Sequence, residues 1–439
     1  MLKIYSYLWQ ILLPKERKTT IILIFIILIQ ALLELISVTS IYPLFSVISD
    51  PNIVNSNPLL SFIYNFFNFK DINYFLIFLS AFSFILIFLR TVFSFCTHYF
   101  ISRFTRIRSH LISSRLLASY VNRPYKFFID KHSSDMSKTI LSEVEQVVGS
   151  CLLPSIEMIA QLSISIAIVI AVLLINPLIT FVPLLIIFLM YGLIINILRD
   201  KTFNLGKDRT FYNARRFRIT QDLFAGIKEV KLSNNEKFYL NEFDFSSFNY
   251  SKLFVKITLF RDFPRYLLEL ISIAALFSII ISLLFNSSKN INDILPTISV
   301  FAFAGIRLLP AFQKLYQAFI TIKFNAPALL ILKNNLARSN LTICNKSNKI
   351  FKLKNNLELK NINYSYSNKV KNYALKNINM DIQANTTVGI VGTTGAGKST
   401  LLDIIVGLLS PASGEVKIDG KPLSNRNVNI WQNALGYVS

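Results

Sequence analysis

Long apolar runs alternate with basic, helix-favouring stretches over residues 1–330 of this 439-residue chain. A helix that crosses a bilayer needs about 20 predominantly apolar residues. Six runs reach that length: 19–43, 73–100, 151–175, 178–198, 264–285 and 295–322. The pattern therefore predicts an α-helical polytopic membrane domain with six transmembrane helices. It is preceded by a short amphipathic entry helix that ends near Pro14.

The basic residues lie almost entirely in one set of connections between these runs. Residues 1–18, 103–145 and 199–265 hold four, eight and fourteen Lys or Arg, whereas the opposite loops hold only Lys70 and Lys289. Cytoplasmic loops carry such an excess. We therefore expect both termini in the cytoplasm. The net charge of +22 then reflects membrane topology, and no nucleic-acid partner is predicted.

The two long basic loops are themselves helix-like. Residues 103–147 and 199–255 read as extensions of the spans, interrupted by breaker regions at 122–125 and 224–229. Two interpretations remain open: the bends dock on a second domain, or they are solvated helix ends.

A polar, Asn-rich segment at 331–350 predicts a linker, and 351–439 then follow an α/β pattern. Strand-like runs cover 357–366, 374–382, 387–391 and 415–420, the last ending in an Asp-Gly pair with hairpin chemistry.

Residues Gly392–Ser399, with the sequence GTTGAGKS, form a complete Walker A motif between a strand-like run and a helix-like run. Its glycines let backbone N–H groups curl around phosphate oxygens. The following helix N-terminus adds unsatisfied donors. Lys398 is expected to reach the β- and γ-phosphates, and the Ser399 hydroxyl to hold Mg²⁺.

This order of segments resembles an ABC exporter half-transporter, in which six spans precede an α/β P-loop nucleotide-binding domain. Residues 413–420 also match that family's segment after the P-loop helix, and residues 435–439 match its strand that runs into the Q-loop. The resemblance implies a homodimer that binds ATP and Mg²⁺, with Tyr366 stacking on adenine. The implied nucleotide-binding residues are Tyr366, Gly392, Thr393, Thr394, Gly395, Ala396, Gly397, Lys398, Ser399 and Thr400.

The sequence departs from that family at its end. It stops at Ser439, one residue before the family's Q-loop glutamine would be expected, and it holds no signature motif, Walker B acid or switch histidine. We therefore expect a C-terminally truncated nucleotide-binding domain with no catalytic residue and little ATP hydrolysis. A membrane-anchored, ATP-binding regulatory subunit is the rival interpretation.

Ionisable residues inside spans mark a pathway or a partner. Arg90, Arg265 and Arg307 are the candidate substrate residues. Arg265 is expected to pair with Glu269 four positions on, and Arg307 has no acid nearby in the sequence. For Glu34 and Glu157, pairing between helices is the alternative to a substrate role.

The segments 34–44 and 306–310 resemble bacterial lipid-linked oligosaccharide flippases of the inner membrane. That resemblance implies an anionic lipid substrate. A multidrug or hydrophobic-lipid exporter is the alternative.

Overall fold

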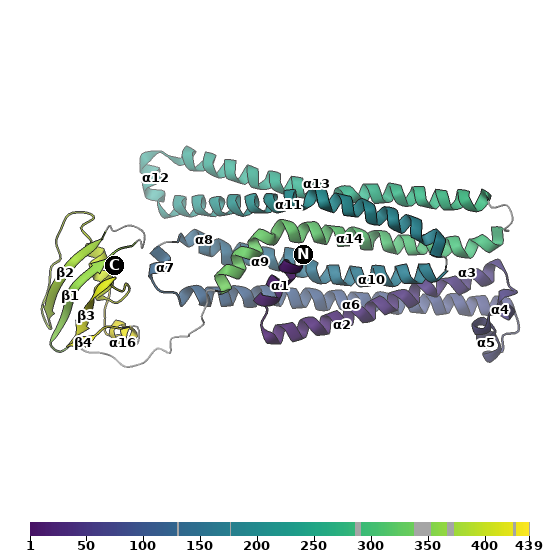
Figure 1. Ribbon diagram of the computed structural model, residues 1–439, viewed down its shortest axis with the longest axis horizontal. Coiled ribbons are helices and arrows are strands. Elements are labelled where there is room, and N and C mark those ends of the chain that lie inside the picture. Colours follow the sequence, from purple (N-terminus) through teal and green to yellow (C-terminus); the bar gives the residue numbers. More distant parts are fainter. Residues whose placement is uncertain are drawn as a thin grey trace. The chain divides into compact units, whose positions relative to one another are not determined.

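The computed structural model describes residues 1–129, 131–175, 177–285, 291–337, 353–366, 373–424 and 427–438 (Figure 1). Asn176, Lys289, Ser439 and most of the expected linker lie outside these residues. The chain divides into two compact units. The first comprises residues 1–117 and 134–338, and the second comprises 118–133 and 339–439.

The first unit is helical (Figure 1). Its elements are α1 (Leu2–Ile11), α2 (Pro14–Thr39), α3 (Ile41–Ser49), α4 (Ile53–Ser56), α5 (Pro58–Phe66), α6 (Ile72–Val121), α8 (Ser133–Lys138), η1 (Thr139–Glu143), α9 (Val144–Val147), η2 (Val148–Leu152), α10 (Leu153–Ile175), α11 (Pro177–Ala225), α12 (Ile227–Ser233), α13 (Glu236–Phe285) and α14 (Ile291–Ala337). The expected entry helix is α1, and Pro14 begins α2, where a missing backbone N–H costs nothing.

The long helices of this unit pack side by side along their length (Figure 1). Helix α10 packs against α2 and α14, and α11 packs against α13 and α14. Small residues such as Ala31, Ala167 and Ala304 lie in the core between α2, α10 and α14, where they let the backbones approach closely.

Among the described residues, four helical stretches are long and apolar enough to cross a membrane. They are Pro14–Ser49, Ile72–Val121, Ser133–Leu173 and Ala302–Leu336. These stretches contain or overlap four of the six expected spans. The other two, 178–198 and 264–285, lie within α11 and α13, and their crossing of the membrane stays a prediction.

The predicted bends in the basic loops are confirmed. Helix α6 ends at Val121 and is followed by the short α7 (Lys126–Ile129). Helix α11 ends at Ala225, and α12 reverses the chain into α13 (Figure 1). The first bend belongs to the second compact unit, because residues 118–133 group with 339–439.

Besides α7, the second unit contains β1 (Asn356–Tyr364), β2 (Leu375–Gln383), α15 (Lys398–Ile405), β3 (Ser413–Ile418), β4 (Lys421–Pro422) and α16 (Val428–Gln432). The four strands form an antiparallel sheet with the strand order β2-β1-β3-β4. The expected strands at 357–366, 374–382 and 415–420 are therefore confirmed as β1, β2 and β3.

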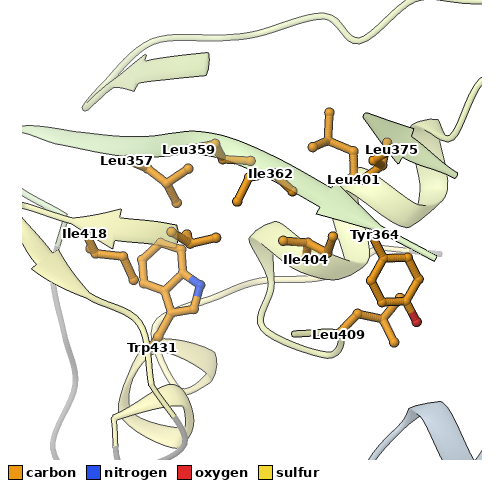
Figure 2. Close-up of a cluster of buried hydrophobic side chains, with 11 residues drawn as sticks. Leu357, Leu359, Ile362, Tyr364, Leu375, Leu401, Ile404, Leu409, Ile418 and Trp431 are labelled. Carbon is orange, nitrogen blue, oxygen red and sulfur yellow. The ribbon is translucent and has the colours of Figure 1, made fainter. Parts of the chain in front are cut away.

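The core of this unit lies between the sheet and the two helices α15 and α16 (Figure 2). Leu357, Leu359 and Ile362 of β1 form one cluster with Ile404 of α15 and Trp431 of α16. Trp431 is buried and donates its indole N–H to the Ile405 carbonyl at 2.9 Å. This packing fixes α15, and with it the end of the Walker A loop, against the sheet.

Two expected strands do not form. Residues 387–391 and 435–438 have no strand assignment, because no described strand lies beside them to supply ladder hydrogen bonds. Their valines remain in solvent, with Val391 93% and Val438 95% exposed. A local apolar pattern predicts a strand, but the strand forms only where an adjacent strand supplies its ladder hydrogen bonds.

The predicted Asp-Gly hairpin turn joins β3 to β4. Both Asp419 and Gly420 have positive φ, at 48° and 77°, as a two-residue turn that matches strand twist requires. The Asp419 carboxylate also accepts three backbone N–H groups, from Lys354 at 2.9 Å, Asn355 at 2.7 Å and Asn356 at 3.1 Å. These hydrogen bonds lower the pKa of Asp419 below its ordinary value.

A pH-dependent stability follows from this carboxylate. Because folding lowers its pKa, Asp419 stabilises the fold above its unfolded pKa of about 3.9, and the contribution is lost as pH falls through the folded value. We expect Asp419→Asn to be less stable than the parent at pH 7 and the difference to shrink below about pH 4. The buried Trp431 reports unfolding by fluorescence once the only other tryptophan is changed by Trp9→Phe. A difference that stays constant down to pH 2 contradicts the assignment.

Candidate nucleotide site and intramembrane charge cluster

The Walker A loop closes onto the start of β2. Gly395 and Gly397 have φ of 85° and 88°, in the left-handed region that favours glycine. A Cβ at Gly397 would lie 2.6 Å from the Ala374 carbonyl oxygen and 2.8 Å from Leu375 Cδ2. Only glycine fits there, so the close approach of loop and strand depends on this residue.

Lys398 begins α15 and folds back over the loop. Its Nζ donates to the Gly392 carbonyl at 2.7 Å and to the Thr393 carbonyl at 2.8 Å. The ammonium group is therefore held directly above the loop, beside the N–H groups of the first helical turn, which have no partner within a helix. The Lys398 ammonium group and the backbone N–H groups at the start of α15 therefore lie together at the Walker A loop.

Tyr366 lies beside the same helix. Its hydroxyl is 2.8 Å from Thr400 Oγ1, and its ring meets Tyr364 edge-on at 5.0 Å between centroids. The Thr400 side chain is buried, whereas Ser399 and Tyr366 are exposed. The structure thus brings together two motifs that are 34 positions apart in the sequence.

These residues fit a nucleotide with its metal ion. The glycine cradle leaves room for phosphate oxygens, Lys398 supplies a cation, and the exposed Ser399 hydroxyl is a hard oxygen ligand of the type Mg²⁺ prefers. All ten expected nucleotide residues lie in the second unit. Their role in binding stays a prediction.

A second group of charges lies within the membrane helices. Glu34 of α2 is only 1% exposed and forms an ion pair with Arg90 of α6. Arg307 of α14 approaches the same carboxylate, with Nε 3.7 Å from Oε1, and its guanidinium lies over the Phe303 ring at 5.5 Å. We name Glu34, Arg90 and Arg307 the charge cluster. The interhelical pairing considered for Glu34 is therefore confirmed.

The three candidate arginines lie in two different surroundings, and their substrate role stays a prediction. Arg307, which has no acid nearby in the sequence, shares Glu34 with Arg90, because α2 and α14 pack together. Arg265 does not join them: it is exposed on α13 and pairs with Glu269 at 2.8 Å, as the i, i+4 spacing predicts. Sequence reasoning singled out Glu34 but did not identify its partners.

Profiles of known families match both the helical part and the C-terminal α/β part of the chain. The family profile described as ABC transporter transmembrane region matches residues 20–305, and the profile described as ABC transporter matches residues 375–439. The second match contains the Walker A loop but not Tyr366.

Individual relatives share limited sequence identity with this chain or match only part of it. A Mycoplasma genitalium protein, MG014, which carries the name of an ABC transporter ATP-binding protein, is 29% identical over 272 residues, covering 58% of this chain and 42% of that protein. ABC transporter C family member 7 of Dictyostelium discoideum is 24% identical over 364 residues, or 80% of this chain and 26% of its own length. Multidrug resistance protein 1 of Entamoeba histolytica is 35% identical over 86 residues, or 20% of this chain and 7% of its own length. The chain thus spans less than half the length of each of these relatives.

Proposed function

This chain belongs to the ABC transporter family, and from that premise we propose that it is an exporter-type subunit that moves an anionic lipid, in particular a lipid-linked oligosaccharide, across a membrane. We further propose that it acts as a homodimer in a bacterial inner membrane. The excess of basic residues in the loops at 1–18, 103–145 and 199–265 supports cytoplasmic termini.

The observation that carries the substrate proposal is the charge cluster. Two guanidinium groups share one carboxylate among apolar helices, so among the described residues the charge cluster has one positive charge in excess. Charges at membrane depth are costly and by default mark a functional site. A guanidinium fork binds phosphate oxygens in pairs, so a lipid phosphate or diphosphate is the ligand that this cluster fits best.

The nucleotide site supplies the driving step in this proposal. When bound, ATP with Mg²⁺ supplies the free energy that favours closure of two nucleotide-binding domains. Backbone N–H groups of the loop 392–399 would hold the phosphates, and the Lys398 ammonium, which donates to the Gly392 and Thr393 carbonyls, would neutralise their charge. The Ser399 hydroxyl would be a ligand of the metal ion, and the Tyr366 ring would stack on the base.

The test replaces the whole charge cluster by leucine, as Glu34→Leu, Arg90→Leu and Arg307→Leu together. Exchanging all partners of a buried ion cluster for apolar residues tends to preserve stability, whereas removing one partner does not. We expect the affinity of the full chain in lipid nanodiscs for a polyprenyl diphosphate to fall by about tenfold or more, since charge-assisted hydrogen bonds are lost.

Two comparisons make this test specific. Arg265→Ala removes an exposed arginine outside the charge cluster and is expected to leave the affinity unchanged. Binding of the uncharged polyprenol is expected to be the same in all variants. If the leucine variant binds the diphosphate as tightly as the parent, the anionic-lipid proposal is wrong, and tight binding of uncharged apolar drugs would then favour a multidrug exporter.

A further inference from the structure

A cavity of about 600 Å³ opens among the helices α2, α6, α10, α13 and α14. Polar side chains from all five helices line it, including Gln30, Glu157, Gln161, Arg261 and Gln317. Its volume is that of a small-molecule site, which usually has mostly apolar walls and only a few polar groups. A polar cavity inside an apolar bundle is expensive, so its lining calls for a ligand of matching chemistry.

The cavity begins next to the charge cluster. Gln30 lies four residues before Glu34 on α2, and Ser94 lies four residues after Arg90 on α6, so each is one helical turn away. Gln30 Nε2 donates to Ser94 Oγ at 3.1 Å, joining the two helices at this point. A single extended molecule therefore reaches both places.

Each charged side chain at the cavity lies near an opposite charge. Arg261 pairs with Asp262 at 3.1 Å, and Gln317 Nε2 also donates to Asp262 at 3.2 Å. Glu157 lies within electrostatic range of His98 and Lys314. The lining thus combines amide, hydroxyl and carboxylate groups with the Lys314 ammonium group and the His98 imidazole, and Lys314 and Glu157 carry opposite charges.

Gln161 of α10 is the lining residue whose side-chain amide is most available to bind a ligand. It is half-buried, and within the described part of the chain its amide forms no hydrogen bond. An amide offers two donors and an acceptor, and the nearby carboxylate of Glu157, one helical turn earlier, offers acceptors. Groups of this kind match hydroxyls, which both donate and accept.

We propose that this cavity binds the uncharged, hydroxyl-rich headgroup of a lipid whose phosphates bind at the charge cluster. The inference rests on the proposed function and adds the part of the substrate that is recognised beyond the phosphate. Gln161 and Glu157 act as specificity residues for sugar hydroxyls, and the charge cluster does not contribute to that discrimination.

The experiment compares three probes on the full chain in lipid nanodiscs: a polyprenyl diphosphate bearing a disaccharide, the same lipid without sugar, and the free disaccharide. We expect the sugar-bearing lipid to bind about tenfold more tightly than the bare lipid, because several hydrogen bonds are gained. Gln161→Leu, alone or with Glu157→Gln, is expected to reduce this preference to about twofold while leaving the affinity for the bare lipid unchanged. Gln10→Leu, an exposed glutamine on α1, is the matched control and keeps the preference.

Each alternative result has a distinct meaning. Equal binding of the sugar-bearing and bare lipids, or a preference that survives both substitutions, overturns this inference and leaves the proposed function standing. If the free disaccharide binds as tightly as the sugar-bearing lipid, the site is one for soluble sugars and the inference is wrong. If neither lipid binds, the proposed function fails and this inference fails with it.

Discussion

Replacing Lys398 by alanine is expected to lower the affinity of the full chain for ATP by about a hundredfold, the largest binding effect of any single change in this protein. The lysine is the cation held directly above the Walker A loop, by hydrogen bonds to the Gly392 and Thr393 carbonyls. Hydrogen bonds to charged groups contribute about 1.5–3 kcal/mol each, and a hundredfold change corresponds to about 2.7 kcal/mol. Fluorescence of a labelled ATP analogue in the presence of Mg²⁺ measures the affinity.

The control for this prediction is Lys376→Ala. Lys376 is exposed on β2, in the same unit, so its removal changes the net charge equally without touching the loop. Equal losses in both variants would mean that the effect comes from overall charge. An unchanged affinity in Lys398→Ala would contradict the assignment of residues 392–399 as the phosphate site.

The largest effect on stability is expected from Glu143→Ala. Glu143 in η1 and Arg209 in α11 are both fully buried, and Nη2 lies 2.6 Å from Oε2. Asn213 Nδ2 donates to the other carboxylate oxygen at 3.0 Å. Removing one partner of a buried pair leaves an uncompensated charge and typically costs about 3–5 kcal/mol. Thermal unfolding of the full chain in detergent micelles should show a correspondingly lowered midpoint.

An exposed ion pair provides the matched comparison. Lys231 and Glu236 lie 3.0 Å apart on either side of the turn between α12 and α13, and their side chains are 66% and 36% exposed. Exposed pairs contribute at most about 1 kcal/mol, so Glu236→Ala should leave the midpoint nearly unchanged. The double variant Glu143→Leu with Arg209→Leu is expected to recover most of the lost stability. A small effect of Glu143→Ala would show that Arg209 finds another partner.

Much of the fold was predictable because its signals are local. The long apolar runs predicted helices, and the breakers near Pro124 and Gly226 predicted the bends. The Asp419-Gly420 pair predicted a hairpin, since both residues tolerate positive φ. The run 387–391 shows the limit of this reasoning: its apolar pattern is that of a strand, yet a ladder requires a partner strand that the pattern does not contain.

The candidate sites divide in the same way. The Walker A loop is determined by the sequence itself, because its glycines, Lys398 and Ser399 are neighbours and their conformation follows from local backbone sterics. The tertiary structure alone decided which charges meet. Glu34 and Arg90 are 56 positions apart, and Glu143 and Arg209 are 66 positions apart, so only the packing of α2, α6, η1 and α11 brings each pair together. Burial makes each pair important for stability, because a charge removed from solvent destabilises the fold unless it has a partner. The sequence does not indicate which residue that partner is.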